Sequence, residues 1–320
     1  MNDRGEGRVL LPPGDRLVEL ARAVPPQILF GTSSWTYPGW HGMVYQREYP
    51  KTGNSAPMLE EYARFPLFRT VGIDSSFYAP PTPEQLTAYA RALPPGFRCV
   101  SKVWDRLTVL TFPKARYRAM GGEPNPDFLN PQVFLDEVLR PFEAHFAGHT
   151  GPFVFEFQTI GRSEGLTPQG FANRLDEFFG QLPREHAYAV EVRNEEYLVP
   201  PYFAVLREHN VAHVFNSWTR MPPVGEQIEL PGSFSAPFTV ARILLRPGRT
   251  YSDAVDAFAP YDRIHDRNAR LRRDIVRLIR QAQALRIPAY ILVNNRAEGS
   301  APITIAAVAE MLEETNEPTG

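Results

Sequence analysis

Short apolar runs alternate with longer amphipathic segments along most of the chain. Buried parallel strands have this apolar character because both faces of their sheet are covered. Between the runs, apolar residues recur at the three- and four-residue spacing of an α-helix. The expected strands are residues 28–32, 70–74, 97–102, 153–158, 187–192, 212–216, 239–245 and 289–294.

Local start signals mark several of the expected helices. Thr82-Pro83-Glu84-Gln85 has the form of a capping box with proline at the first helical position. Asn130-Pro131 and Thr167-Pro168 open two further helices with a polar cap followed by proline. From Leu271 to Leu285, apolar residues recur at helical spacing and predict one long helix.

About eight strands that alternate with helices in one chain are typical of a (β/α) barrel. We therefore predict an α/β fold of the TIM type, (β/α)8, in a single domain. A doubly wound open sheet is the alternative. No strand is followed by the Gly-x-Gly-x-x-Gly fingerprint that would favour it.

The predicted barrel domain spans residues 27–315. Residues 1–26 are expected to form a short N-terminal extension that ends at Pro25-Pro26, and residues 316–320 a C-terminal tail. The connection from Trp104 to Asn130 is long for a barrel loop. Because it follows the third strand, it belongs to the functional face of a barrel, either as a lid or as an inserted loop.

Composition and charge limit the classes of function. The chain has 320 residues, of which 43% are hydrophobic and 22% charged, as in soluble globular proteins. The formal net charge of −2 supplies no overall basic field for nucleic acid or an anionic membrane. The single cysteine, Cys99, leaves no internal disulfide and is expected to be a small buried residue. With no apolar stretch long enough for a membrane span, we expect a cytoplasmic protein.

Six segments at the expected strand ends carry a recognisable pattern. They are Gly31 to Trp40, Ile73 to Tyr78, Pro95 to Lys102, Phe155 to Gln158, Glu191 to Asn194, and Asn294-Asn295. Together they resemble the motifs of the domain-of-unknown-function-72 family, also called YecE-like, over residues 28–312. The resemblance implies a TIM-type barrel and implies no reaction. The chain departs from the family pattern at Asp74, at Glu156 and at Arg246-Pro247-Gly248-Arg249.

Two carboxylates are the leading candidates for acid–base chemistry. Glu191 and Arg193 share one face at the end of the strand 187–192, and Glu156 and Gln158 are placed in the same way on the strand 153–158. Glu191 is the first-choice acid or base, oriented by Arg193, with Glu156 as its partner. The alternative is a structural set of ion pairs that fills the barrel mouth, since buried charges must be paired.

Basic residues at other strand ends are expected to bind negative charge. Lys102 ends the third strand and Arg246 follows the seventh. Together with the loop residues Lys114, Arg116 and Arg118, they form a candidate clamp for a phosphate or carboxylate. Lys102 is also a candidate proton-transfer residue, which places it in the predicted catalytic set.

The remaining candidate residues are polar and aromatic side chains at or after the strand ends. They are expected to bind substrate, and they are Thr32, Ser33, Trp35, Trp40, Asp74, Ser75, Tyr78, Asn216, Asn294 and Asn295. The two tryptophans would form one wall of the pocket, because aromatic rings stack on sugars and bases. Their alternative role is loop packing.

We therefore predict an enzyme that acts on a small polar, anionic or sugar-like substrate by carboxylate acid–base chemistry. Its reaction would be that of a hydrolase, a lyase or an isomerase. The alternative is a module that binds a ligand or nucleic acid without turnover. No cofactor is firmly implied, although Asp74, Glu156 and Glu191 offer the hard oxygen ligands that a divalent metal prefers. The sequence does not specify an oligomeric state.

Overall fold

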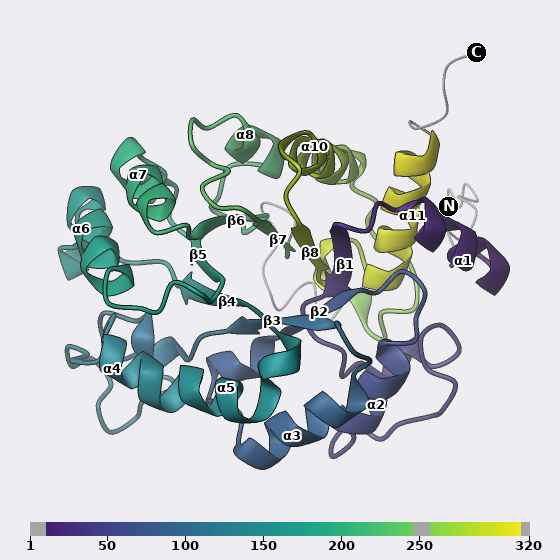
Figure 1. Cartoon of the computed structure of the whole chain (residues 1–320), viewed down its shortest axis with the longest axis horizontal. Coiled ribbons are helices and arrows are strands. Elements are labelled where there is room, and N and C mark those ends of the chain that lie inside the picture. Colours follow the sequence, from purple (N-terminus) through teal and green to yellow (C-terminus); the bar gives the residue numbers. More distant parts are fainter. Residues whose placement is uncertain (1–10, 246–256, 315–320) are drawn as a thin grey trace, which may run out of the picture.

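The computed structural model describes residues 11–245 and 257–314. Eight parallel strands form a nearly closed barrel in the order β1-β8-β7-β6-β5-β4-β3-β2 (Figure 1). The strands are β1 (Ile28–Thr32), β2 (Thr70–Ile73), β3 (Arg98–Lys102), β4 (Thr150–Phe157), β5 (Tyr188–Val192), β6 (Ala212–Asn216), β7 (Thr239–Ile243) and β8 (Ala289–Val293). This arrangement confirms the predicted (β/α)8 barrel.

The strands form where the apolar runs predict them. All five residues of β5, β6 and β7 are buried, as expected for strands that carry side chains into the barrel on one face and against helices on the other. The largest difference is at β4, which begins at Thr150 rather than at residue 153.

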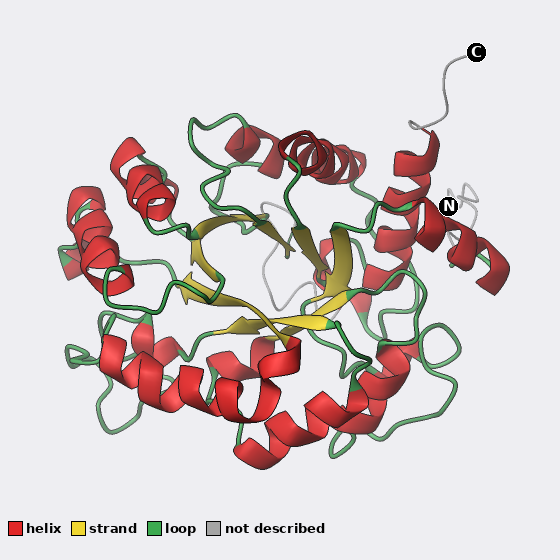
Figure 2. Cartoon of the chain, in the orientation of Figure 1, coloured by secondary structure: helices red, strands yellow, loops and turns green. Residues whose placement is uncertain are grey.

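Helices surround the strands (Figure 2). Three of them begin as their sequence signals predict: Thr82 forms a capping box before α3, Asn130 caps α4, and the Thr167 side chain accepts a hydrogen bond from Gly170 N before α6. The helices are α1 (Gly14–Ala23), α2 (Ser55–Tyr62), α3 (Pro83–Ala92), α4 (Pro131–Phe134), α5 (Arg140–Phe146), α6 (Pro168–Phe179), α7 (Pro200–Glu208), α8 (Val224–Ile228), α10 (Ala269–Leu285) and α11 (Ala301–Glu314). One turn of π-helix, Leu135–Leu139, joins α4 to α5.

The boundary between β1 and β2 is closed by a side chain. The hydroxyl of Tyr62 accepts a hydrogen bond from Thr32 N (2.9 Å) and donates one to Thr70 O (3.1 Å). A backbone hydrogen bond from Arg69 N, the residue before β2, to Phe30 O (2.8 Å) lies further down. The two strands approach so closely that a Cβ on Gly31 would lie 2.1 Å from Thr70 O, which explains the glycine there.

The segment before the barrel contains α1, which lies beside the C-terminal helix α11. Arg16 of α1 donates a hydrogen bond to the carboxylate of Glu313 in α11 (Nη1 to Oε1, 3.1 Å). The N-terminal extension is thus attached to the helix that completes the barrel, while its boundary at residue 26 stays a prediction. None of the helices within the described ranges has the length and apolar character needed to cross a membrane.

The long connection after β3 has internal structure of its own. Its two arms pair through Phe112 N and Glu123 O (3.0 Å), and the Asn125 side chain donates to Arg106 O and Val109 O (2.7 Å each). These bonds fix the arm of the loop that lies nearest the barrel, so that the loop forms one wall of the cavity described below.

Candidate functional site

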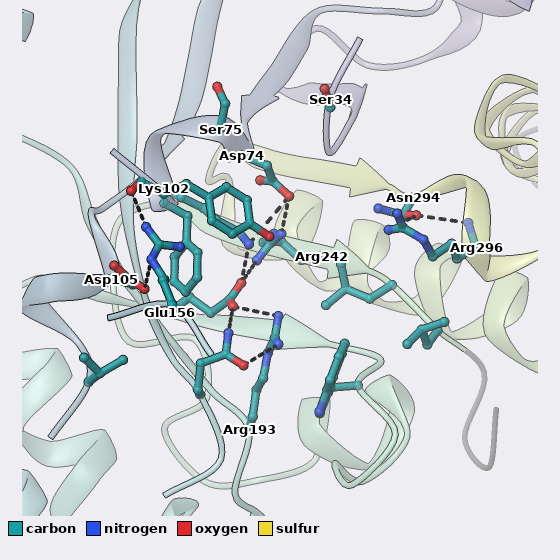
Figure 3. A pocket seen from close by; sticks show the side chains of 18 of the residues that line it. Ser34, Asp74, Ser75, Lys102, Asp105, Glu156, Arg193, Arg242, Asn294 and Arg296 are labelled. Carbon is teal, nitrogen blue, oxygen red and sulfur yellow. Dashed lines mark hydrogen bonds and ion pairs between the residues drawn. The ribbon is translucent and has the colours of Figure 1, made fainter. Parts of the chain in front are cut away.

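A cavity of about 510 Å³ opens at the C-terminal ends of the strands, which is the functional face of such barrels. We call it the barrel mouth. Side chains at or after the ends of all eight strands contribute to its lining. They include Ser34, Tyr37, Asp74, Ser75, Tyr78, Lys102, Asp105, Arg116, Glu156, Gln158, Arg193, Trp218, Arg242, Asn294 and Arg296. Figure 3 shows Asp105 at one edge of the view and Asn294 and Arg296 at the other, with Asp74, Glu156 and Arg242 between them.

Strand register brings the charged side chains of the barrel together. Glu156 on β4 is paired with Glu191 on β5, and Asn216 on β6 with Arg242 on β7. Because alternate residues of a barrel strand point inward, these positions place carboxylates and a guanidinium in the interior. Asp74 and Lys102 reach the same place from the ends of β2 and β3. Asp74, Lys102, Glu156, Glu191, Arg193 and Arg242 form what we call the charge network.

Arg242 is the centre of the charge network. Its Nη2 lies 2.7 Å from Asp74 Oδ2, and its Nη1 lies 2.7 Å from Glu156 Oε2 and also binds Glu191. The side chain is only 2% exposed. Burial alone would lower the pKa of the guanidinium, but the three carboxylates outweigh burial and raise that pKa further above its usual value. Arg242 is therefore permanently charged.

Lys102 and Arg193 complete the network from opposite sides of Glu156. Lys102 Nζ lies 2.5 Å from Glu156 Oε2 and 3.6 Å from Asp74 Oδ2. Arg193 Nη2 lies 2.8 Å from Glu156 Oε1, and its Nε lies 3.5 Å from Glu191 Oε1. The network thus balances three acidic groups with three basic ones, as charges removed from water require.

The surroundings of Glu156 make it a poor proton acceptor. Burial of the carboxyl would raise its pKa, but the charges of Arg193, Lys102 and Arg242 outweigh burial and hold that pKa well below its usual range. A carboxylate with such a low proton affinity is a weak base at neutral pH. Glu156 is therefore better suited to hold Lys102 and the arginines in place.

Gln158 and Trp218 hold the Arg193 guanidinium where it meets the cavity. Gln158 Oε1 accepts a hydrogen bond from Arg193 Nη1 (3.1 Å), and the Gln158 amide group donates to Glu156. The Arg193 guanidinium carbon lies 3.8 Å from the centre of the Trp218 ring, which is a cation–π contact. Trp218 therefore combines an apolar surface with a fixed positive charge.

A second cluster lies on the wall formed by the loop after β3. Asp105 Oδ1 accepts a hydrogen bond from the Tyr117 hydroxyl (2.6 Å), and Arg116 Nε lies 3.0 Å from Asp105 Oδ2. Burial raises the pKa of Asp105 although the Tyr117 bond and Arg116 act in the opposite direction. Burial, together with the bond to Asp105, raises the pKa of Tyr117 to about 12. Two carboxyls of one cavity, Asp105 and Glu156, thus have pKa values shifted in opposite directions.

The structure brings many of the predicted site residues to the barrel mouth. Of the predicted set, Asp74, Ser75, Tyr78, Lys102, Glu156, Gln158, Arg193 and Asn294 line the cavity. Glu191 belongs to the charge network but is fully buried beneath Arg242 and Arg193. The prediction that Glu191 faces the substrate as first-choice acid or base therefore does not agree with its position.

Trp35 and Trp40 do not form a wall of the barrel mouth. Trp35 donates its indole N–H to Ser55 O (2.7 Å) and packs edge-on against the Tyr89 ring. Trp40 is fully buried, with its ring centre 4.8 Å from that of Tyr37. Both tryptophans thus have the loop-packing role that was the alternative, although their neighbours Ser34 and Tyr37 line the cavity.

Four further predicted residues lie near the site but contact the protein itself. Asn216 donates to Val192 O (3.1 Å) and accepts from Trp218 N (3.1 Å), and Asn295 accepts from Ala301 N (2.8 Å) at the start of α11. Thr32 contacts the Tyr62 hydroxyl at the boundary between β1 and β2, and Ser33 is buried. None of these four is among the described residues that line the barrel mouth. The predicted site residue Arg246 lies outside the described residues.

Sequence reasoning missed Arg242, Asp105, Tyr37 and Arg296. Arg242 had a detectable signal, because an arginine inside the apolar strand Thr239–Ile243 must be buried and therefore paired. Asp105 lies three residues after the end of the third strand and directly after Trp104, where the long connection begins. In the described ranges, no group of three or more His, Cys, Asp or Glu residues is arranged to hold a metal ion.

Comparison with known proteins agrees with the fold and the motifs. The model of a family described as protein of unknown function DUF72 matches residues 29–319, which confirms the resemblance seen in the sequence. A DUF72 family protein from Thermotoga maritima is 18% identical, with a TM-score of 0.59 over 89% of this chain and 99% of that one. A DUF72 family protein from Enterococcus faecalis is 16% identical, with a TM-score of 0.58 over 90% of this chain and 95% of that one. A search of curated proteins gives no significant match.

Proposed function

Since this chain belongs to the DUF72 family, whose function is unknown, we propose a function from the barrel mouth itself. The protein is an enzyme that binds a small polar substrate with a negative charge and transfers protons through Lys102 and Asp74. The observation that carries the proposal is the charge network, a balanced set of six acidic and basic side chains of which five line one cavity. Such desolvated, mutually fixed charges are typical of active sites.

The lining of the cavity favours an anionic substrate. In the described part of the chain, five basic side chains line it against three acidic ones. The basic ones are Lys102, Arg116, Arg193, Arg242 and Arg296, and the acidic ones are Asp74, Asp105 and Glu156. Because the site is partly closed to water, an excess of positive groups attracts an anion more strongly than on an open surface.

Within the network, Lys102 and Asp74 are the groups best placed to exchange protons with a substrate. The Lys102 ammonium can donate three hydrogen bonds, and it forms ion pairs with Glu156 (2.5 Å) and Asp74 (3.6 Å). Asp74 uses Oδ2 for Arg242 and Lys102, and its side chain is 24% exposed, more than any other carboxylate of the network. In the proposed step, Lys102 gives a proton to a substrate oxygen while Asp74 takes one from the attacking water or from the substrate itself, so the summed charge of the pair does not change. Hydrolysis, elimination and isomerisation all use such a step.

Binding and turnover test this proposal separately. The binding probes are glycerol 3-phosphate and glycerol, titrated calorimetrically into wild type, Lys102→Gln and the exposed control Lys51→Gln. Only glycerol 3-phosphate, and not glycerol, should bind to the wild type and to Lys51→Gln. The Lys102→Gln substitution should weaken the binding of glycerol 3-phosphate at least tenfold. If glycerol bound as tightly as glycerol 3-phosphate, or if Lys102→Gln had the wild-type affinity for glycerol 3-phosphate, the proposal of an anionic substrate would be wrong.

The turnover probes are 4-nitrophenyl phosphate and the α and β anomers of 4-nitrophenyl glucuronide. All three are anionic substrates with a chromogenic leaving group. Wild type should release nitrophenolate from at least one of them. Lys102→Gln and Asp74→Asn should slow that release by about 10²- to 10⁴-fold, the usual contribution of a positioned acid or base. Binding without any turnover would favour the ligand-binding module over the enzyme.

A further inference from the structure

A second, more apolar cavity adjoins the barrel mouth. Its volume is about 250 Å³, and it lies between the segment that follows β6 and the start of α10. Trp218 and Leu245 border both cavities. We call this cavity the side groove. Its apolar lining includes Trp218, Met221, Pro223, Val224, Leu245 and Leu271.

The charged residues of the side groove are engaged with the protein itself. Arg270 Nη2 lies 2.8 Å from Glu226 Oε1, and its Nε lies 4.0 Å from Asp274 Oδ2. Asp274 is also 4.0 Å from Arg277 Nη1. The groove therefore offers a ligand an apolar floor, in contrast to the barrel mouth with its three acidic and five basic side chains.

Buried polar contacts hold the floor of the side groove in place. The Gln227 side chain is fully buried and donates to Asn216 O (2.7 Å) and Pro222 O (2.6 Å). Met221 N donates to Trp218 O (3.0 Å), which closes the turn that carries both side chains. A ligand would therefore meet a surface that is already ordered, and little conformational entropy would be lost on binding.

We infer that the side groove receives the apolar part of the same substrate whose charged part occupies the barrel mouth. This inference rests on the proposed function. The two residues that border both cavities, Trp218 and Leu245, have apolar side chains, and the neighbouring Leu244 also lines the mouth. A molecule whose negative group is held by the basic residues of the mouth can thus extend its apolar part past Trp218 and Leu245 into the groove. The substrate class is therefore an amphipathic anion, such as a phosphate or carboxylate that carries an alkyl or aryl substituent.

A homologous series of ligands tests this inference. The probes are inorganic phosphate, methyl phosphate, butyl phosphate and hexyl phosphate, with hexanol as the neutral counterpart, in calorimetric titrations at pH 7.5. Each methylene that enters the groove should tighten binding about fourfold, until the groove is full. Hexanol alone should not bind, because it lacks the group that the basic residues hold.

Matched variants locate the apolar part. Met221→Gln should flatten the dependence on chain length and leave the affinity for inorganic phosphate unchanged. Met43→Gln makes the same change at a different cavity and should preserve the dependence. Lys102→Gln should weaken all four phosphates by one common factor. Circular dichroism and the melting temperature of each variant establish that it is folded.

The outcomes separate this inference from the proposed function. If inorganic phosphate binds and chain length has no effect, the side groove holds no part of the substrate, and the proposed function stands. An equal dependence on chain length in Met221→Gln and Met43→Gln, or tight binding of hexanol alone, would also overturn the inference. If none of the phosphates binds, the proposed function falls and the inference falls with it.

Discussion

Arg242 shows how strongly one residue can depend on its neighbours. Its guanidinium is taken out of water and is stable there because Asp74, Glu156 and Glu191 surround it. The reverse holds as well, because the same three carboxylates depend on that guanidinium. The loss of one partner therefore costs more than the intact ion pairs contribute, since it leaves buried charges without compensation.

We expect Arg242→Met to lower the free energy of unfolding at pH 7 by roughly 3–5 kcal/mol, the usual cost of an uncompensated buried charge. Arg270→Met removes an exposed arginine with its ion pair to Glu226 and should change stability by less than about 1 kcal/mol. Urea denaturation of both variants measures the difference. Similar small losses in the two would contradict the central role of Arg242.

The residue scale also shows what strand parity can predict. Parity correctly places Glu156, Glu191 and Arg193 in one interior cluster. Strand parity does not say how deeply a side chain is buried. Glu191 is covered by Arg242, which lies on a strand that we predicted only as an apolar run. The error at Trp35 and Trp40 has another origin, because both residues lie in the loop beyond the strand, where alternation no longer applies.

At the scale of elements, the strands and the helix starts are well predicted because each has a local cause. An apolar run is buried whatever its neighbours are, and a capping box forms within a few residues. The contact of β1 with β2 has no such local signal. It depends on Tyr62, the last residue of α2, whose hydroxyl takes the place of a backbone partner for both strands.

We expect Tyr62→Phe to destabilise the protein by about 1–3 kcal/mol, because it leaves Thr32 N and Thr70 O buried without a partner. Tyr188→Phe is the matched control. Its hydroxyl is also buried, but within the described part of the chain that hydroxyl has no hydrogen-bond partner. Its removal should therefore be nearly neutral. Thermal unfolding of the two variants compares them, and equal effects would contradict the role assigned to Tyr62.

At the scale of the whole molecule, the barrel itself is predictable and its cavities are not. Alternating strands and helices specify the barrel, since few other folds bury that pattern. The barrel mouth and the side groove depend instead on how loops from distant parts of the sequence pack. Asp105 and Arg116 reach the mouth because Asn125 fixes the loop after β3, a contact that no spacing in the sequence reveals.

Stability of the whole protein should fall on mild acidification because of His213. Burial lowers the pKa of this histidine from 6.5 to about 4. Between those values the unfolded chain binds a proton that the folded protein does not, so stability is lost as the pH falls. From pH 7 to pH 5 the loss amounts to about 2 kcal/mol.

Urea denaturation at the two pH values measures this loss. His213→Gln should make stability less dependent on pH in this range, whatever it does to stability at pH 7. His145→Gln, at an exposed position, should retain the dependence of the wild type. If the stability of His213→Gln depended on pH as strongly as that of the wild type, groups other than His213 would cause the loss.

The closure of the barrel through Tyr62 has a consequence for how the protein opens in the native state. Continuous backbone ladders join β1 to β8 and β8 to β7, so their amides are released to solvent only when several bonds break together. At the boundary of β1 and β2, the hydroxyl of one tyrosine must move before water can enter. We therefore expect the backbone amides of β2 to exchange with deuterium before those of the other strands. In this respect the barrel is a curved sheet whose two end strands, β1 and β2, are held together chiefly by one side chain.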